Sequence, residues 1–164
     1  MAARSYFRLV ILAAVLTVLA GTPAFADATV FVGANTTPAN RTVTGLAIGA
    51  GLPIIVFEFE FASTSEDLSA GAPSLKIGSV NLLLQTPRAI GGVQPYFTTG
   101  AGIFSESLGT IHDETSFAPN MGGGLKLSLV GPLRLRVDYR VFRLGRGALY
   151  SPAHRVYVGL NLKF

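Results

Sequence analysis

The feature that most constrains this chain is an alternation of side-chain types with a period of two. Residues 133–141 (LRLRVDYRV) alternate apolar and charged side chains, and residues 57–61 (FEFEF) alternate Phe and Glu. Successive side chains of a β-strand point to opposite faces. Each segment therefore predicts a strand with one apolar and one charged face. The i, i+3, i+4, i+7 spacing of an amphipathic helix does not describe the chain after residue 26.

The rest of the chain divides into segments of the same kind and gives eight predicted strands in all. Long polar connections alternate with short turns between them, and this alternation is typical of an outer-membrane barrel, whose short turns face the periplasm. The predicted strands are residues 29–35, 43–50, 54–62, 75–85, 93–104, 117–129, 133–143 and 155–164. The predicted long connections are Thr36–Thr42, Ser63–Ser74, Ser105–Ser116 and Leu144–His154.

Two soluble folds compete with this interpretation: a β-sandwich, which also has short, regularly spaced strands, and a lipocalin-like barrel with an apolar interior. The distribution of small residues favours the membrane barrel. Gly and Ala share the charged face, whereas Phe, Leu and Tyr gather on the apolar face. Small residues suit the narrow lumen of an eight-stranded barrel, which side chains just fill. The predicted fold class is therefore all-β, an eight-stranded antiparallel transmembrane up-and-down β-barrel.

Residues 1–26 have the pattern of a secretory signal peptide. Arg4 and Arg8 form a basic start, an apolar core follows at 10–20, and Ala-Phe-Ala at 24–26 matches an A-x-A cleavage site. A transmembrane helix is the alternative, but it needs roughly 20 apolar residues and this core is shorter. We expect cleavage after about Ala26, which divides the chain into residues 1–26, the signal peptide, and 27–164, the barrel.

Composition removes several other classes of protein. The chain has no Cys, which excludes disulfides, thiol catalysis and zinc–thiolate sites. Its basic residues do not cluster among aromatic residues, so nucleic-acid binding is not expected. Cofactors and metal sites are not expected either.

The charged faces of the predicted strands should meet in the lumen. Isolated buried charges are costly, so we expect a network in which Glu58 and Glu60 accept hydrogen bonds from Arg side chains. Such a network is either a structural plug or a gate for ions, and its excess of bases would favour anions. The predicted network is Glu58, Glu60, Lys126, Arg134, Arg136, Asp138 and Arg140, with Asn161 and Lys163 also facing inward. Arg155 lies on the same inward row of the last predicted strand.

An enzyme is the least favoured class. A hydrolase needs a nucleophile, a base and an orienting acid. Neither His112 nor His154 has a serine and an acid at a spacing that indicates such a triad. His112 lies in the predicted loop 105–116. Lipid A deacylase barrels carry a Ser two residues after a His on one strand face, and Val156 stands at that position here. We predict that the chain has no catalytic residues.

Two segments resemble the OmpA/OmpX-like family of eight-stranded outer-membrane barrels: VQPYFTTGAG at 93–102 and RVYVGLNLKF at 155–164. The resemblance implies a bacterial outer-membrane location and a C-terminal signal read by the barrel-assembly machinery. That signal would be Val156, Val158, Leu160, Leu162 and Phe164. OmpA continues into a peptidoglycan-binding domain, which is not expected here.

The resulting functional expectation is a non-enzymatic barrel, monomeric and in contact with outer-membrane lipid. It would contribute to membrane integrity or to surface interactions through its long loops. The alternative is a small channel for ions or small solutes.

Overall fold

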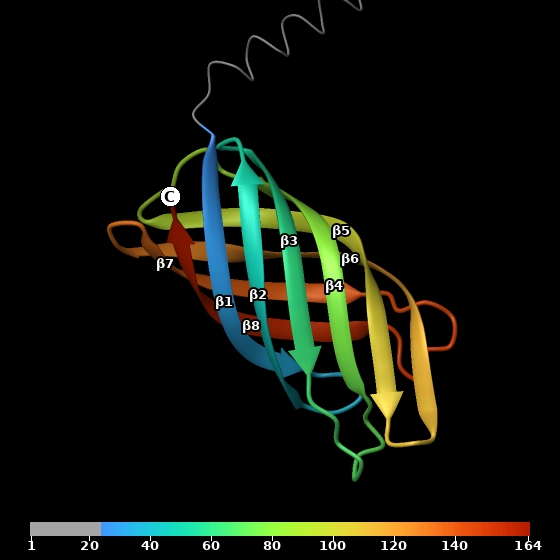
Figure 1. Ribbon diagram of the computed structural model, residues 1–164. Coiled ribbons are helices and arrows are strands. Elements are labelled where there is room, and N and C mark those ends of the chain that lie inside the picture. Colours follow the sequence, from blue (N-terminus) through green and yellow to red (C-terminus); the bar gives the residue numbers. More distant parts are fainter. Residues whose placement is uncertain (1–23) are drawn as a thin grey trace, which may run out of the picture.

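The computed structural model describes residues 24–164, which form a closed barrel of eight antiparallel strands (Figure 1). Residues 1–23, most of the predicted signal peptide, lie outside this described part. The strands are β1 (Phe25–Asn35), β2 (Arg41–Gly51), β3 (Ile55–Thr64), β4 (Ser74–Gln85), β5 (Val93–Leu108), β6 (His112–Val130), β7 (Leu133–Phe142) and β8 (Ala153–Lys163). Each overlaps one of the predicted segments, so the predicted fold class is confirmed.

The barrel closes where the first and last strands pair. β1 and β8 run antiparallel from the Asp27–Lys163 pair to the Asn35–Arg155 pair, and every other strand pairs with its neighbours in sequence. Closure leaves no unpaired strand edge, which is what a sheet exposed to lipid requires. Within residues 24–164, no helix is long and apolar enough to cross a membrane.

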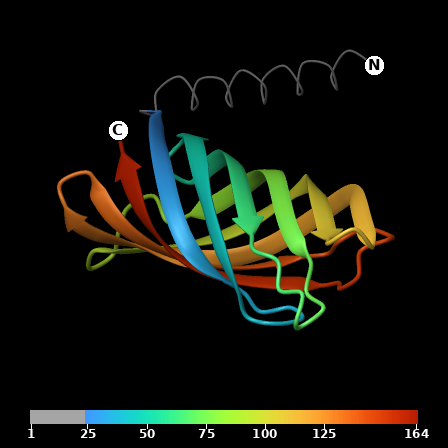
Figure 2. The same ribbon diagram turned by 60° about the horizontal axis from the view of Figure 1, so that its bottom comes forward.

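The two ends of the barrel differ in their connections. The start of β1 and the end of β8 lie side by side at one end (Figure 2), where Ala26 and Phe164 exchange backbone hydrogen bonds of 2.9 Å. The turns at 52–54, 86–92 and 131–132 lie at this same end, and the connections at 36–40, 65–73, 109–111 and 143–152 lie at the other. In outer-membrane barrels the end with the short turns faces the periplasm, so the first end is named the periplasmic end and the other the outer end.

One predicted connection is wrong. Residues 105–116 are not a long loop, because β5 continues to Leu108 and β6 starts at His112, so only three residues turn the chain. The pairs from Ser105–Thr115 to Leu108–His112 extend the ladder. The polar composition of this segment suggested a loop. A paired hairpin that projects beyond the lipid can carry polar side chains, so polarity alone does not end a strand.

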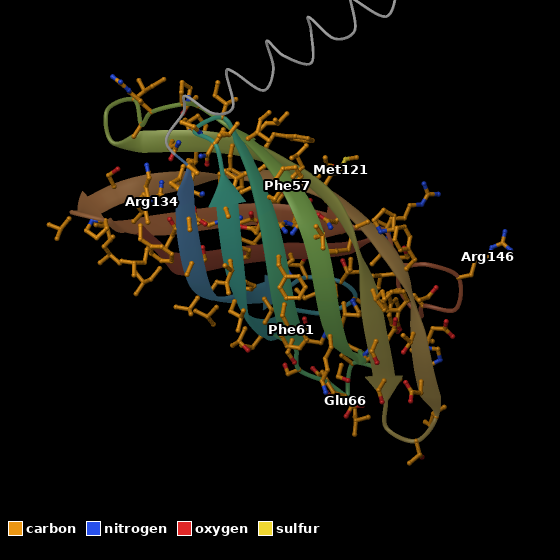
Figure 3. The ribbon with its side chains drawn as sticks, turned by 45° about the horizontal axis from the view of Figure 1, so that its top comes forward. Phe57, Phe61, Glu66, Met121, Arg134 and Arg146 are labelled. Carbon is orange, nitrogen blue, oxygen red and sulfur yellow. The ribbon has the colours of Figure 1, made fainter. Side chains whose placement is uncertain are left out.

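The outer wall carries the large apolar side chains. Phe57 and Phe61 of β3 point away from the barrel (Figure 3), and Phe57 is 64% exposed. Glycine makes room on the inner wall. A Cβ on Gly45 would collide with the Phe31 ring, and one on Gly124 would collide with the Val137 carbonyl oxygen and the Tyr96 hydroxyl. The side-chain sizes on the two walls thus agree with the sequence pattern.

The inner wall is more mixed than that pattern indicated, because apolar clusters accompany the charges. A cluster around Phe104 and Phe142 fills the end with the long connections. Val56, Leu83 and Tyr96 form a second cluster toward the periplasmic end. A third contains Phe31, Val43, Ala62 and Tyr157, in which the Phe31 and Tyr157 rings stack with centroids 4.0 Å apart. The charged side chains lie among these clusters.

Candidate functional site: a charged network in the lumen

Glu58 lies at the centre of the charged network. The FEFEF alternation of β3 turns its carboxylate inward, where the side chain is 1% exposed. Arg136 and Arg140 of β7 both donate to it: Arg136 contacts both carboxylate oxygens, and Arg140 Nη2 lies 3.4 Å from Oε1. The two-oxygen contact uses the planar fork of arginine, a geometry that lysine cannot reproduce.

Asp138 and Tyr96 connect the same two arginines. The Asp138 carboxylate accepts hydrogen bonds from Arg136 at 3.3 Å, from Arg140 at 3.1 Å and from the Tyr96 hydroxyl. The Tyr96 hydroxyl in turn accepts a hydrogen bond of 2.8 Å from Arg136 Nε. Arg136 also lies over the Tyr96 ring, 4.8 Å from its centroid. Several partners therefore fix the orientation of the Arg136 side chain.

Glu60, two residues after Glu58 on the same strand, lies nearer the long connections. Its carboxylate contacts Arg140 at 3.2 Å and also accepts a hydrogen bond from Arg155 of β8. Arg155 lies over the Phe142 ring, 4.7 Å from its centroid. Arg140 therefore links Glu58, Glu60 and Asp138, and Arg155 extends the network to the apolar cluster.

Asp27 forms the periplasmic end of the network. Its carboxylate accepts hydrogen bonds from Lys126 Nζ at 2.7 Å and from Arg134 Nη2 at 3.2 Å. Two amides complete the partners: Gln85 accepts from Lys126 at 3.3 Å, and Gln94 accepts from Arg134 at 2.9 Å. Gln85 and Gln94 lie on β4 and β5, so this group joins strands from opposite sides of the barrel.

The structure brings together all seven residues of the predicted network, each of them buried. Asn161 also faces inward and donates to the Thr29 hydroxyl at 2.9 Å. Lys163 also lies on the inward face, opposite Asp27 in the β1–β8 ladder, but it is exposed at the end of β8, where it lies over the Phe25 ring and outside the network. The buried set is Glu58, Glu60, Lys126, Arg134, Arg136, Asp138 and Arg140.

The predicted network lacked Asp27 and Tyr96, and it did not include Arg155. Parity had already placed Arg155 on the inward row of its strand, and Tyr96 lies at an inward position of β5 that parity could have indicated. Asp27 was missed because it directly follows the expected cleavage site and the first strand was placed at 29–35. With these residues the paired groups are four acids and five bases, rather than the three acids and five bases of the prediction. The positive charge of the observed network therefore exceeds its negative charge by less than the prediction indicated.

The connections at the outer end also contact one another. The Glu66 carboxylate accepts a hydrogen bond of 2.6 Å from the Gly109 backbone, which joins the β3–β4 connection to the β5–β6 turn. The Glu106 carboxylate accepts one of 3.1 Å from the Leu149 backbone in the β7–β8 connection. In the β3–β4 connection, hydrogen bonds from Ser69 and the Ala70 backbone lower the pKa of the Asp67 carboxyl. The outer surface is thus a connected set of segments.

The two histidines lie apart. His112 is the first residue of β6, and its Nε2 is 3.9 Å from Glu106 Oε1. His154 lies on the outer wall, where its Nδ1 and the Tyr139 hydroxyl are 2.7 Å apart. In the part of the chain that the structure describes, no group of three or more His, Cys, Asp or Glu side chains could hold a metal ion.

Comparisons with known proteins show what this architecture resembles. No protein-family model and no curated protein sequence matches the chain. Among solved structures, the N-terminal β-barrel domain of Pseudomonas aeruginosa OprF superimposes with a TM-score of 0.65 at 13% identity, over 85% of this chain and 97% of that domain. Neisserial surface protein A gives 0.60 at 16% identity, over 86% and 96% of the two chains. The outer membrane enzyme PagL gives 0.54 at 12% identity, over 83% and 98%.

Fold, strand pairing and neighbours together define the class of fold: the chain has the closed, antiparallel β-barrel of outer-membrane proteins. Within that class it has the eight-stranded, OmpA/OmpX-like form, so the predicted resemblance is confirmed at the level of the fold. Because the fold is shared with PagL as well as with OprF and NspA, it does not decide between an enzyme and a non-enzymatic barrel.

Proposed function

We propose that the chain is a non-enzymatic outer-membrane barrel whose lumen is closed by the charged network. Its role is then structural, as a contribution to membrane integrity or to surface interactions through the outer connections. The observation that carries this proposal is the pairing of the acids. Each of the four network acids (Asp27, Glu58, Glu60 and Asp138) contacts two basic side chains.

Such pairing favours a fixed plug over a moving gate. A gate must exchange ion-pair partners, and each exchange would leave a charge unpaired in a desolvated lumen, at a cost of several kcal/mol per ion. A change of partners would be costliest for Arg136, because Glu58, Asp138 and Tyr96 all accept its hydrogen bonds. The apolar cluster around Phe104 and Phe142 adds a second barrier near the outer end.

The surroundings of the histidines support the non-enzymatic part of the proposal. A Ser–His hydrolase needs a hydroxyl nucleophile within hydrogen-bond reach of the base. His154 instead pairs with the phenol of Tyr139, and its nearest outward neighbour along β8 is Val156. His112 lies against Glu106 at 3.9 Å.

A small channel is the second candidate, and unpaired polar groups in the lumen favour it. Among the described residues, Thr98 Oγ1 and Asn120 Oδ1 are buried without a hydrogen-bond partner. Buried polar groups of this kind are often bridged by water, and water-bearing positions could form part of an ion path. With four acids and five bases in the network, any such path would have a weak preference for anions.

Planar-bilayer recording on the refolded protein separates the two candidates. We expect wild-type protein to give no unitary currents, in bilayers where a general porin conducts under the same conditions. Reproducible currents with anion selectivity, abolished by Arg136→Ala, would overturn the closed barrel and establish the channel. Recording Glu58→Ala in parallel tests the gate directly, because currents that appear only in this variant would show that the Glu58–Arg136 pair blocks an existing path.

The remaining expectations belong to the same proposal. The chain would be exported with cleavage after about Ala26, folded by the barrel-assembly machinery and monomeric in the outer membrane. Cleavage there would make Asp27, which contacts Lys126 and Arg134 in the network, the first residue of the mature chain. The intact mass of protein purified from outer-membrane fractions tests the cleavage site, and a gel shift on boiling tests for a folded barrel.

A further inference from the structure

The outer wall has a groove of about 1090 Å³ beside the β7–β8 connection. Its floor crosses three strands, because Thr99, Met121 and Val141 are register partners on β5, β6 and β7. Phe117, four residues before Met121 on β6, extends the floor toward the outer end. Phe117 is 58% exposed and Met121 is 60% exposed, so this apolar surface is open to the surroundings of the barrel.

Two arginines border the groove at its outer end. Arg143 follows Val141 by two residues and is exposed, and its backbone nitrogen donates to the Pro119 carbonyl oxygen at 2.9 Å. Arg146 projects from the β7–β8 connection, while Met121 lies on the barrel wall (Figure 3). The groove has no acidic residue in its lining. Within residues 24–164, no ion pair involves either guanidinium.

Close packing holds the β7–β8 connection against the barrel wall. Gly145, between the two arginines in sequence, lies against β6: a Cβ there would be 2.6 Å from Ser116 Oγ and 3.0 Å from the Phe117 carbonyl oxygen. Further along the connection, the Leu149 backbone donates to the buried Glu106 carboxylate. These contacts keep both arginines at the edge of the groove.

We propose that this groove binds an outer-leaflet lipid with a phosphorylated headgroup. Its acyl chain would lie along Phe117 and Met121, and its phosphate would accept hydrogen bonds from Arg143 and Arg146. The planar arginine fork matches phosphate oxygens. The long connections mark the outer end of a barrel of this class, so the change from apolar Val141 to charged Arg143 places the arginines at headgroup level.

The charge and position of the groove together select this occupant. A purely apolar partner would leave two cationic side chains without a counter-charge, and a soluble anion would leave the apolar floor uncovered. A phosphorylated lipid supplies a counter-charge for the arginines and an acyl chain for the apolar floor. Its headgroup and chain are covalently joined, so one molecule can span from Arg143 to Met121. The site lies on the outer wall, so it is independent of whether the lumen conducts.

Met121 provides a direct probe of the groove. The chain contains two methionines, Met1 and Met121, so ¹³C labelling of methionine methyl groups places one reporter on the groove floor. The full-length protein is refolded into dodecyl maltoside micelles, which contain no phosphate, and bis-phosphorylated lipid A is titrated into them. We expect a saturable shift of the Met121 methyl resonance.

Paired variants assign the effect to the two arginines. The double variant Arg143→Gln/Arg146→Gln should weaken the apparent affinity about tenfold or more, since it removes both charge-assisted contacts. Arg88→Gln is the matched control: this exposed arginine lies in the β4–β5 turn at the opposite end of the barrel, and the affinity should not change. A mobility shift on boiling confirms that each variant is folded. Equal affinities for wild type and the double variant would overturn the proposal.

Two further titrations identify the source of the phosphate. Lipid A with both phosphates removed should bind about tenfold more weakly or worse, because it keeps the chains and loses the arginine contacts. Inorganic phosphate should leave the Met121 methyl unchanged, since it has no acyl chain to reach the floor. Equal binding of the dephosphorylated lipid would make the groove a nonspecific acyl contact. A Met121 shift with inorganic phosphate equal to that with lipid A would indicate a free-anion site. Either result contradicts the proposal.

Discussion

The two faces of β3 place the same strand in two different environments. Glu58 and Glu60 are each 1% exposed, and each contacts arginines from other strands. Phe57 and Phe59, which alternate with them, are 64% and 54% exposed on the outer wall. The inner wall thus depends on particular partners at particular positions. The outer wall requires only that side chains be apolar and of suitable size, because lipid adapts to them.

This difference has an energetic consequence. On the inner wall, a deleted side chain leaves its partners charged and desolvated, which is much costlier than the net value of the pair itself. On the outer wall, a smaller apolar side chain is replaced by lipid contacts, and no partner is left unsatisfied. Matched substitutions on the two walls therefore test whether the distinction is real.

The largest effect is expected for Glu58→Ala. Its removal leaves Arg136 and Arg140 with Asp138 as their remaining shared carboxylate, and breaking a buried pair in this way costs about 3–5 kcal/mol. We expect the free energy of unfolding in lipid vesicles to fall by that amount. Guanidinium titration followed by circular dichroism measures it, since the chain has no tryptophan for fluorescence.

Phe59→Leu is the outer-wall control for that experiment. It changes the neighbouring residue of the same strand and keeps an apolar surface toward lipid, so the expected loss is less than about 1.5 kcal/mol. If Glu58→Ala and Phe59→Leu lost equal amounts, the inner wall would be no more specific than the outer wall, and the comparison of the two faces would fail.

A smaller effect is expected from glycine substitutions on the two walls. Gly124→Ala adds a methyl group that collides with the Val137 carbonyl oxygen and the Tyr96 hydroxyl, and overpacking of this kind costs about 1–3 kcal/mol. Gly78 of β4 lies on the opposite, outward parity, and its Cβ would meet nothing within 4 Å. Gly78→Ala should therefore change the free energy of unfolding by less than about 0.5 kcal/mol. The same titration measures both, and a larger loss from Gly78→Ala would contradict the assignment of the walls.

Sequence periodicity predicted the features of the barrel that depend on one strand at a time. It gave the number of strands and placed Glu58 and Arg136 on the inner wall. The choice of partners depends on how strands are staggered around the closed barrel, and no local pattern encodes this. The extension of β5 to Leu108 was missed because its residues are polar. Parity placed Lys163 on the inward face but does not show where the lumen ends, so it did not predict that this side chain is exposed.

A small effect on the stability of refolded protein, with a larger effect on assembly in cells, is expected for Phe164→Ala. Phe164 continues the outward row of β8 (Val156, Val158, Leu160 and Leu162), and its side chain is 66% exposed. The substitution leaves the pairing of β8 with β1 intact, so the loss in the free energy of unfolding in vesicles should stay below about 1.5 kcal/mol, the low end for burying a large apolar side chain. If this residue belongs to the assembly signal, the amount of folded barrel in outer-membrane fractions should fall severalfold.

Phe57→Ala is the matched control, because Phe57 is an outer-wall phenylalanine with nearly the same exposure, 64%. Lipid should treat the two rings alike, so both variants should show similar small losses in refolded protein. Only Phe164→Ala should reduce assembly in cells, as measured by immunoblotting of boiled and unboiled fractions. Equal assembly of the two variants would mean that the outer wall is indifferent to position even at its last residue. A selective loss for Phe164→Ala would show that assembly requires a particular side chain at this outer-wall position, just as the inner wall requires particular charged partners.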